Sequence, residues 1–120
     1  MILVDTSVWV DHLQVGNKTV AGLLNAGRVL VHPFVIGELA LGNLRHRRTI
    51  LAYLQDLPQA NAATDPEVLH FIEQHDLAGL GIGYVDVHLL ASTCLTAGSS
   101  LWTRDKRLLS VAERLGVANE

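Results

Sequence analysis

Residues 1–13 read MILVDTSVWVDHL, in which an apolar run changes at once into a carboxylate followed by two hydroxyls. Residues 2–4 are branched and apolar, the pattern of a short strand buried on both faces in a parallel sheet. Asp5 follows directly, and either Thr6 or Ser7 can cap the helix that we expect next. The stretch therefore predicts a strand that passes straight into a helix, with Asp5 at the carboxyl end of the strand.

Apolar runs alternate with helical patterns along the rest of the chain. We expect two more strands, at residues 29–31 and 101–103, each bounded by polar or turn residues. Pro33 suits the first turn of a helix, and the acid Asp65 is expected to cap the helix in which Pro66 occupies the first position. The pattern predicts an α/β sandwich with a mostly parallel sheet. The other helices are expected at residues 17–26, 33–44, 47–57, 84–96 and 105–115.

The composition is that of an ordinary globular protein. With 120 residues, 49% of them apolar, the chain can bury one sizeable core, so we expect a single domain over residues 1–120. No apolar run approaches the roughly 20 residues of a membrane helix, and the start lacks the basic residues of a signal peptide, which predicts a cytoplasmic protein. Cys94, the single cysteine, is expected to be a small buried hydrophobe.

Charge and histidine content bear on the kind of ligand. The six histidines are scattered without the spacing typical of a zinc site. A net charge of −3 at first argues against nucleic acid as a partner. If several acids share a metal pocket, however, the bound ions cancel them and the remaining surface is more basic. Two basic runs are present, RHRR at residues 45–48 and RDKR at residues 104–107.

Two acids follow predicted strands. In an open α/β sheet, functional sites lie at the carboxyl ends of the parallel strands. Asp5 occupies such a position, and Asp105 occupies another, two residues after the third predicted strand. Each of them also has a purely structural explanation, because an aspartate at the start of a helix can cap it. If their strands are neighbours, the two carboxylates should meet.

Two further acids interrupt apolar helical stretches. Glu38 is the only charge in FVIGELAL, residues 34–41, and Asp86 stands in YVDVHLLA, residues 84–91. A carboxylate that faces the core must be paired, neutralised or bound to a metal, because burying it alone is costly. For Asp86 the structural alternative is a first-turn acid that the helix dipole favours.

If the four acids converge, they predict a metal site. Two carboxylates about 5 Å apart at an effective dielectric constant of about 20 repel by roughly 3 kcal/mol, so an empty pocket would strain the fold or raise its pKa values. All-oxygen sites with open positions suit Mg²⁺ or Mn²⁺, ions that also bind phosphate oxygens. Such ions can activate a water for attack on a phosphorus.

Four segments together resemble one family. DTSVWVDHL, FVIGEL, GIGYVDVHLLAS and LWTRDKRL occur in the order and spacing of the PIN domain, and specifically of the VapC-type ribonuclease toxins of prokaryotic toxin–antitoxin pairs. The resemblance covers nearly the whole chain. It implies an α/β/α sandwich, a Mg²⁺- or Mn²⁺-dependent endoribonuclease, a homodimer, and a separately encoded antitoxin that occludes the site and contributes DNA binding.

The resemblance also implies roles for particular residues. Asp5 and Asp86 would be the direct metal ligands, and Glu38 and Asp105 would complete the group of metal-binding acids. Hydroxyls beside the carboxylates would orient ligands or water. These hydroxyls belong to Thr6, Ser7 and Thr103.

The basic runs are candidates for contact with the RNA backbone, a contribution that does not depend on sequence. Some relatives carry a further acid just after the last aspartate, where this chain has Lys106 and Arg107, so a second metal position is in doubt. Trp9 and Trp102 are expected in the core rather than as stacking surfaces for bases. The backbone candidates are Arg45, Arg47, Arg48, Arg104, Lys106 and Arg107.

Two alternative functions remain open. An α/β phosphohydrolase could form a covalent intermediate on Asp5, although the residue two positions later, where one such class carries a second acid, is Ser7. A non-catalytic interaction module could keep the fold without the chemistry, but loss of an acid would point there and all four are present.

Overall fold

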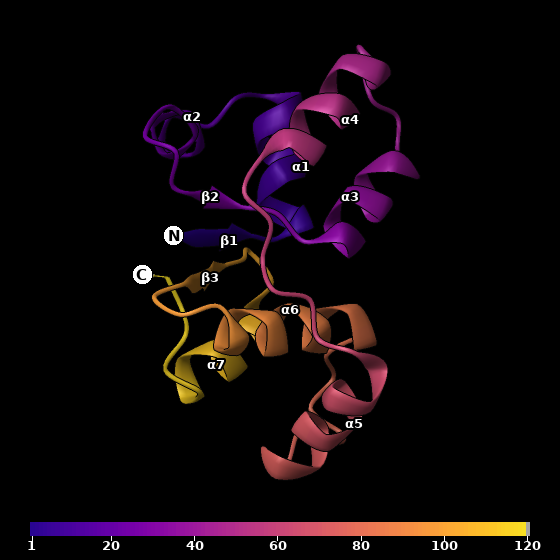
Figure 1. Cartoon of the computed structure of the whole chain (residues 1–120), viewed down its shortest axis with the longest axis vertical. Helices are drawn as coiled ribbons and strands as arrows, with labels where there is room; N and C mark the ends of the chain where they lie inside the picture. The colour runs from indigo at the N-terminus through magenta and orange to yellow at the C-terminus, as the bar shows by residue number, and fades with distance from the viewer. Residues whose placement is uncertain (120) are drawn as a thin grey trace.

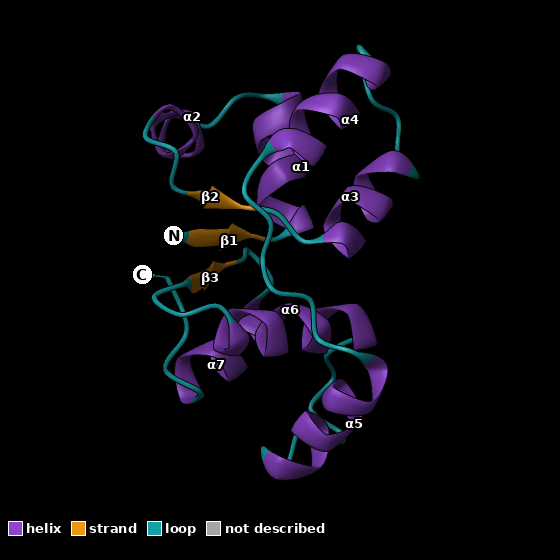
Figure 2. Ribbon diagram, in the orientation of Figure 1, coloured by secondary structure: helices purple, strands orange, loops and turns teal. Residues whose placement is uncertain are grey.

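The computed structural model describes residues 1–119, in which a parallel sheet of three strands lies between two layers of helices (Figures 1 and 2). β1 (Ile2–Val4) is central and pairs in parallel with β2 (Val29–Leu30) on one side and with β3 (Ser100–Trp102) on the other. All three residues of β1 are buried, as expected for a strand covered on both faces. The predicted α/β/α sandwich with a parallel sheet is therefore confirmed.

Short additional bridges continue both edges of the sheet. Val31, the last residue of the predicted second strand, pairs with Gln59 just beyond β2, and Leu101 pairs with Ala118 on the outer side of β3. These bridges satisfy backbone groups that an open edge strand would leave exposed.

The helices divide between the two faces of the sheet (Figure 1). One layer follows β1 and β2, and the other contains a central helix that is buried from Val87 to Thr93. The helix before it packs on that central helix rather than on the sheet. The first layer consists of α1 (Thr6–Gln14), α2 (Lys18–Asn25), α3 (Pro33–Ala40) and α4 (Arg47–Asp56), and the second of α5 (Asp65–Gln74), α6 (Tyr84–Leu95) and α7 (Lys106–Arg114).

The third helix is shorter than predicted. It ends at Ala40 instead of residue 44, and Gly42 N–H bonds to the carbonyl of Leu39 in a tight turn. The guanidinium of Arg47 then donates to the carbonyls of Ala40 and Gly42. This side chain satisfies carbonyls that the end of the helix leaves free, and Gly42 directly after the C-cap is a residue typical of a helix end.

The residues predicted to cap α1 and α5 are wrong in both cases. Neither Thr6 nor Ser7 caps α1, because Asp5 occupies the N-cap position and its side chain makes no capping bond. These hydroxyls bond to acids instead.

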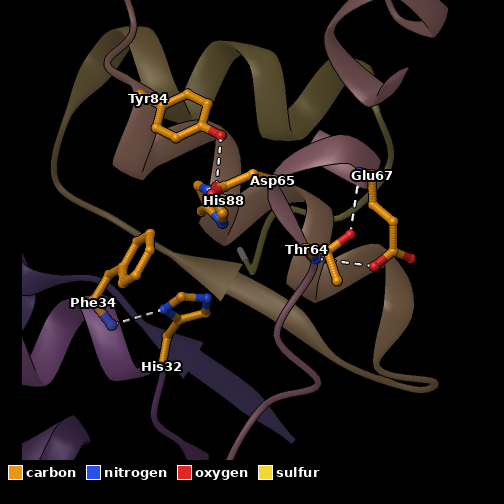
Figure 3. Close-up of polar contacts among 7 residues, drawn as sticks. All are labelled: His32, Phe34, Thr64, Asp65, Glu67, Tyr84 and His88. Carbon is orange, nitrogen blue, oxygen red and sulfur yellow. Dashed lines mark hydrogen bonds and ion pairs between the residues drawn. The ribbon is translucent and has the colours of Figure 1, made fainter. Parts of the chain in front are cut away.

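At the start of α5, Thr64 is the cap in place of Asp65. Its Oγ1 accepts from Glu67 N–H at 3.3 Å, and Glu67 Oε1 accepts from Thr64 N–H at 2.9 Å, a reciprocal capping box (Figure 3). Asp65 is thereby released for contacts with another helix.

The core confirms the prediction for Trp9, which is buried, while Trp102 is partly buried against the same cluster. Cys94 departs from its prediction, since it is exposed beside a hollow between α5 and α6. Across residues 1–119, no helix has both the length and the apolar character needed to cross a membrane.

Candidate active site

Asp5 is the buried anchor of the site. It lies at the carboxyl end of β1 and is only 6% exposed. Its Oδ2 accepts hydrogen bonds from Ser7 Oγ at 2.8 Å and from Thr103 Oγ1 at 2.7 Å. Two hydroxyl donors on one oxygen fix the orientation of the carboxylate and leave Oδ1 without a hydrogen-bond donor from residues 1–119.

The same two hydroxyls tie the loop after β3 to Asp5. Ser7 Oγ accepts from Arg104 N–H at 3.1 Å, and Thr103 Oγ1 accepts from Asp105 N–H at 3.0 Å. Each hydroxyl thus donates to the carboxylate and accepts from the backbone of the loop. This arrangement brings the start of α7, and with it Asp105, to the carboxyl end of β1.

Asp105 also caps α7. Its Oδ1 accepts from the backbone N–H groups of Arg107 at 2.9 Å and Leu108 at 3.0 Å. The structural explanation therefore holds for this oxygen. Asp105 is exposed, and its Oδ2 accepts no hydrogen bond within the described chain, so this oxygen can face a ligand.

Glu38 does not face the core, which corrects the prediction. The helical period turns Val35 and Leu39 inward and places Glu38 on an outward stripe with Phe34 and Leu41. Apolar residues on both faces of α3 concealed this direction in the sequence. Thr6 Oγ1 donates to Glu38 Oε1 at 2.6 Å, which holds the glutamate against the start of α1.

Asp86 is the acid whose pKa responds to the charges of the other three. It is half-buried in the first turn of α6, and its Oδ2 accepts from Gly83 N–H at 3.1 Å. Burial is the main cause that raises the pKa of Asp86, and the negative charges of Asp5, Asp105 and Glu38 raise it further, while the bond from Gly83 opposes them. The structure thus brings the four predicted acids into one electrostatic group.

The donor set suits a hard divalent cation. The four carboxylates form no ion pair with any described Lys, Arg or His, so only hydrogen bonds, and no positive side chain in contact, offset their mutual repulsion. Among residues 1–119, no three His, Cys, Asp or Glu side chains are already placed as ligands of one ion. Mg²⁺ keeps several waters and commonly takes only one or two protein carboxylates, so an all-oxygen group of this kind fits it.

The predicted RNA-backbone candidates fall into two places. Arg45, Arg47 and Arg48 lie at the α3–α4 connection and are exposed, with Arg47 engaged in closing α3. Arg104 lies beside the acids, where it forms an ion pair with Asp11 at 2.9 Å.

A basic hollow next to α7 was not predicted. It measures about 320 Å³, and none of its lining residues is acidic. Arg114 joins Lys106 and Arg107 there, and its spacing from both is about two helical turns, which the sequence does contain. A larger hollow of about 550 Å³, between α5 and α6, contains none of the four acids and has no part in the site. The basic hollow is lined by Leu80, Lys106, Arg107, Ser110, Val111 and Arg114.

Comparisons with known proteins identify the family of this chain. Residues 2–114 match the PIN domain family. Ribonuclease VapC32 of Mycobacterium tuberculosis, in strains CDC 1551 / Oshkosh and ATCC 25618 / H37Rv, is 45% identical over 118 residues, or 98% of this chain and 95% of the relative.

Two solved structures share the fold. FitAcB from Neisseria gonorrhoeae has a TM-score of 0.64 at 19% identity and covers 98% of this chain and 95% of its own. FitAB bound to an IR36 DNA fragment has a TM-score of 0.61 at 19% identity, with coverages of 98% and 92%. The family match and the 45% identity over nearly the full length show that this chain belongs to the PIN domain family, and within it to the VapC type.

Proposed function

We propose that the protein is a metal-dependent endoribonuclease, the toxin of a type II toxin–antitoxin pair, and that it hydrolyses phosphodiester bonds of RNA. The observation that carries the proposal is the convergence of Asp5, Glu38 and Asp105 on Asp86, where burial is the main cause that raises the pKa of the carboxyl group and the three negative charges raise it further. The name ribonuclease of the relative that is 45% identical supports it.

Mg²⁺ or Mn²⁺ is the proposed cofactor. Asp5 and Asp86 would hold the ion, with Glu38 and Asp105 placed to bind its waters or a second ion. When bound, such an ion lowers the pKa of a water molecule and stabilises charge on phosphate oxygens.

The protein's own contribution is to hold the oxygen donors in place. Ser7 and Thr103 fix the Asp5 carboxylate, and Thr6 fixes Glu38. Carboxylate oxygens that are already oriented lose little conformational freedom when the metal ion and the substrate bind. The reacting groups therefore meet with less reorganisation of the protein.

The basic hollow supports RNA as the substrate. Lys106 and Arg107 follow Asp105 directly, so phosphates next to the cleaved bond would lie within their reach. Arg114 would extend this contact along α7. Positive side chains of this kind contribute affinity without reading the base sequence.

We also propose the partners that the VapC type implies. A cognate antitoxin would cover the acids and bind operator DNA. The structural neighbour FitAB, solved bound to an IR36 DNA fragment, is itself a DNA-binding assembly, which supports this proposal. A homodimer and a cytoplasmic location complete the proposal.

The first experiment is cleavage of total cellular RNA by the purified protein with Mg²⁺ or Mn²⁺, and with a chelator. We expect discrete fragments only with metal, and none from Asp5→Asn protein that retains its circular dichroism spectrum. Cleavage that survives both the chelator and the substitution would contradict the proposal.

The outcome also separates the two alternatives. A phosphorylated Asp5 detected by mass spectrometry after incubation with phosphate esters would favour a phosphohydrolase. RNA binding without any cleavage by wild-type protein would favour a non-catalytic module.

The contribution of the basic hollow is tested by Lys106→Gln. Lys106 is exposed and makes no ion pair within residues 1–119, so the substitution should remove one phosphate contact and little else. We expect weaker binding of single-stranded RNA in chelator, with the slope of log affinity against log salt reduced by about 0.7. Fluorescence anisotropy at several salt concentrations measures this slope.

The matched control is Lys18→Gln, since Lys18 is an exposed lysine on α2. If the slope of log affinity against log salt is the same for both variants and for wild-type protein, Lys106 does not contact the RNA.

A further inference from the structure

Two exposed aromatic rings open the helices that carry Glu38 and Asp86. Phe34 in the first turn of α3 is 40% exposed, and Tyr84 at the first position of α6 is 45% exposed. Exposing a large ring forgoes the stabilisation that its burial would bring. The core therefore does not account for the position of either ring.

The rings are connected through a buried histidine. The ring centroid of His88 lies 4.6 Å from that of Phe34 and 4.7 Å from that of Tyr84, and Phe34 lies 5.1 Å from His32 (Figure 3). His32 and His88 are buried, so they support Phe34 and Tyr84 from the protein side. The result is one continuous aromatic group that joins α3 to α6.

Hydrogen bonds hold this group in place. Tyr84 donates its phenolic hydrogen to Asp65 Oδ1 at 2.8 Å, and His88 Nε2 lies 3.2 Å from the same oxygen. On the other side, His32 Nδ1 accepts from Phe34 N–H at 3.0 Å. The aspartate that does not cap α5 thus fixes the orientation of Tyr84 (Figure 3).

The rings are close to the acids along their helices. Phe34 precedes Glu38 by four residues, which places both on the outward stripe of α3 about 6 Å apart along the axis. Tyr84 and Asp86 both lie in the first turn of α6, but two residues apart they point to different sides of the helix, so Phe34 is the ring on the side of an acid. A nucleotide whose phosphate lies beside Glu38 would therefore have its base, or that of a neighbouring nucleotide, within reach of Phe34, and Tyr84 would extend the aromatic surface from there.

An unpaired nucleobase is the ligand that these observations favour. Bases of single-stranded RNA stack on aromatic side chains, and every base offers a flat face. The two rings form a small group that their neighbours already hold in place. Neither ring carries a charge: Phe34 has no ionisable group, and the hydrogen bond to Asp65 raises the pKa of Tyr84 above its ordinary value. A protein partner would be expected to use a larger apolar area.

We propose that Phe34 and Tyr84 form a stacking platform that binds unpaired RNA bases next to the carboxylates. The proposal rests on the proposed ribonuclease function and adds to it the selection of single-stranded RNA. Asp65 accepts the hydrogen bond of the Tyr84 hydroxyl at the edge of this platform.

The test measures binding of a labelled single-stranded RNA by fluorescence anisotropy in chelator, so that cleavage does not interfere. Phe34→Leu and Tyr84→Leu should each weaken binding by about 5- to 150-fold, the loss typical of removing a ring that stacks on a base. Tyr84→Phe keeps the ring and should retain most of the affinity. Tyr53→Leu, which removes an exposed tyrosine of α4, is the matched control and should bind as wild type.

A second probe, the same RNA with abasic nucleotides, separates stacking from a general structural effect. Wild-type protein should lose affinity for the abasic RNA, while the two leucine variants should bind both RNAs almost equally. If the variants distinguish the two RNAs as strongly as wild type does, the platform does not touch bases and the proposal is wrong. The same holds if the variants bind RNA normally but self-associate less, since the rings then form a protein interface.

The stacking platform and the proposed nuclease function can be disproved independently of each other. Metal-dependent cleavage by wild type with unchanged RNA binding by both leucine variants would overturn the platform alone. RNA binding that depends on the rings, in a protein that never cleaves, would overturn the nuclease and leave the platform supported.

Discussion

Asp86→Asn is expected to lower the rate of RNA cleavage by about 10³-fold, because it removes a charged ligand from the proposed metal site and several kcal/mol of transition-state stabilisation with it. The change conserves side-chain size, and Gly83 N–H can still donate to the amide oxygen. The measurement is the rate of fragment formation at saturating Mg²⁺ or Mn²⁺, beside wild-type protein.

The same substitution should stabilise the metal-free protein at neutral pH. Burial, and the charges of Asp5, Asp105 and Glu38, raise the pKa of Asp86 above its ordinary value of 3.8. A carboxyl group with a raised pKa contributes stability that is fully present below that ordinary value and is lost as the pH rises through the raised value. At pH 7 the wild-type protein has lost this contribution, whereas asparagine never ionises.

Urea denaturation in chelator measures the difference. The midpoint of Asp86→Asn should exceed that of wild type at pH 7, and the gap should narrow as the pH approaches 4. Added Mg²⁺ should stabilise wild type more than the variant. Asp56→Asn, at an exposed acid of α4, is the matched control. A less stable Asp86→Asn at pH 7 would show that the bond from Gly83 N–H to the charged carboxylate outweighs the burial and the repulsion that raise the pKa of Asp86.

The sheet and the helix order could be predicted from the sequence because the relevant signals are local. Each strand is a short apolar run that ends at a polar residue, and Asp5 marks the change from β1 to α1. The rule that sites lie at the carboxyl ends of parallel strands then predicts that Asp5 and Asp105 lie together.

The parts that escaped prediction depend on contacts between distant residues. Arg47 closes α3 by reaching back to the carbonyls of Ala40 and Gly42, a contact that the apolar pattern around residue 40 does not reveal. In the same way, Thr6 and Ser7 have the chemistry of caps, but Glu38 and Asp5 take their hydroxyls. A hydroxyl at a helix start has two possible acceptors, and only the fold decides between them.

The aromatic platform was hidden for a related reason. Phe34 lies in a run of apolar residues that reads as core, and only the observed rotation of α3 shows that it faces outward with Glu38. Tyr84 is oriented by Asp65, which local sequence assigns to helix capping. Exposure of a ring is a property of packing, so composition and spacing do not reveal it.

Leu3→Ala is expected to reduce the free energy of unfolding by about 3–5 kcal/mol. Leu3 is fully buried at the middle of β1, where it pairs with Leu30 of β2 and Leu101 of β3. Removing three carbon atoms there leaves a cavity that the two flanking strands cannot close without breaking their own pairing. Domains of this size have only about 5–15 kcal/mol of stability, so the loss is a large fraction of the total.

The effect should extend to the site, because Leu3 is two residues before Asp5, which follows directly on β1. Urea denaturation followed by circular dichroism measures the stability, and cleavage assayed below and above the lowered melting temperature shows whether the site survives while the fold does. Leu41→Ala is the control, since Leu41 is 91% exposed and its truncation should change stability by less than about 0.5 kcal/mol. Similar losses for the two variants would mean that the central strand does not organise the core, and the position of Asp5 would then need another explanation.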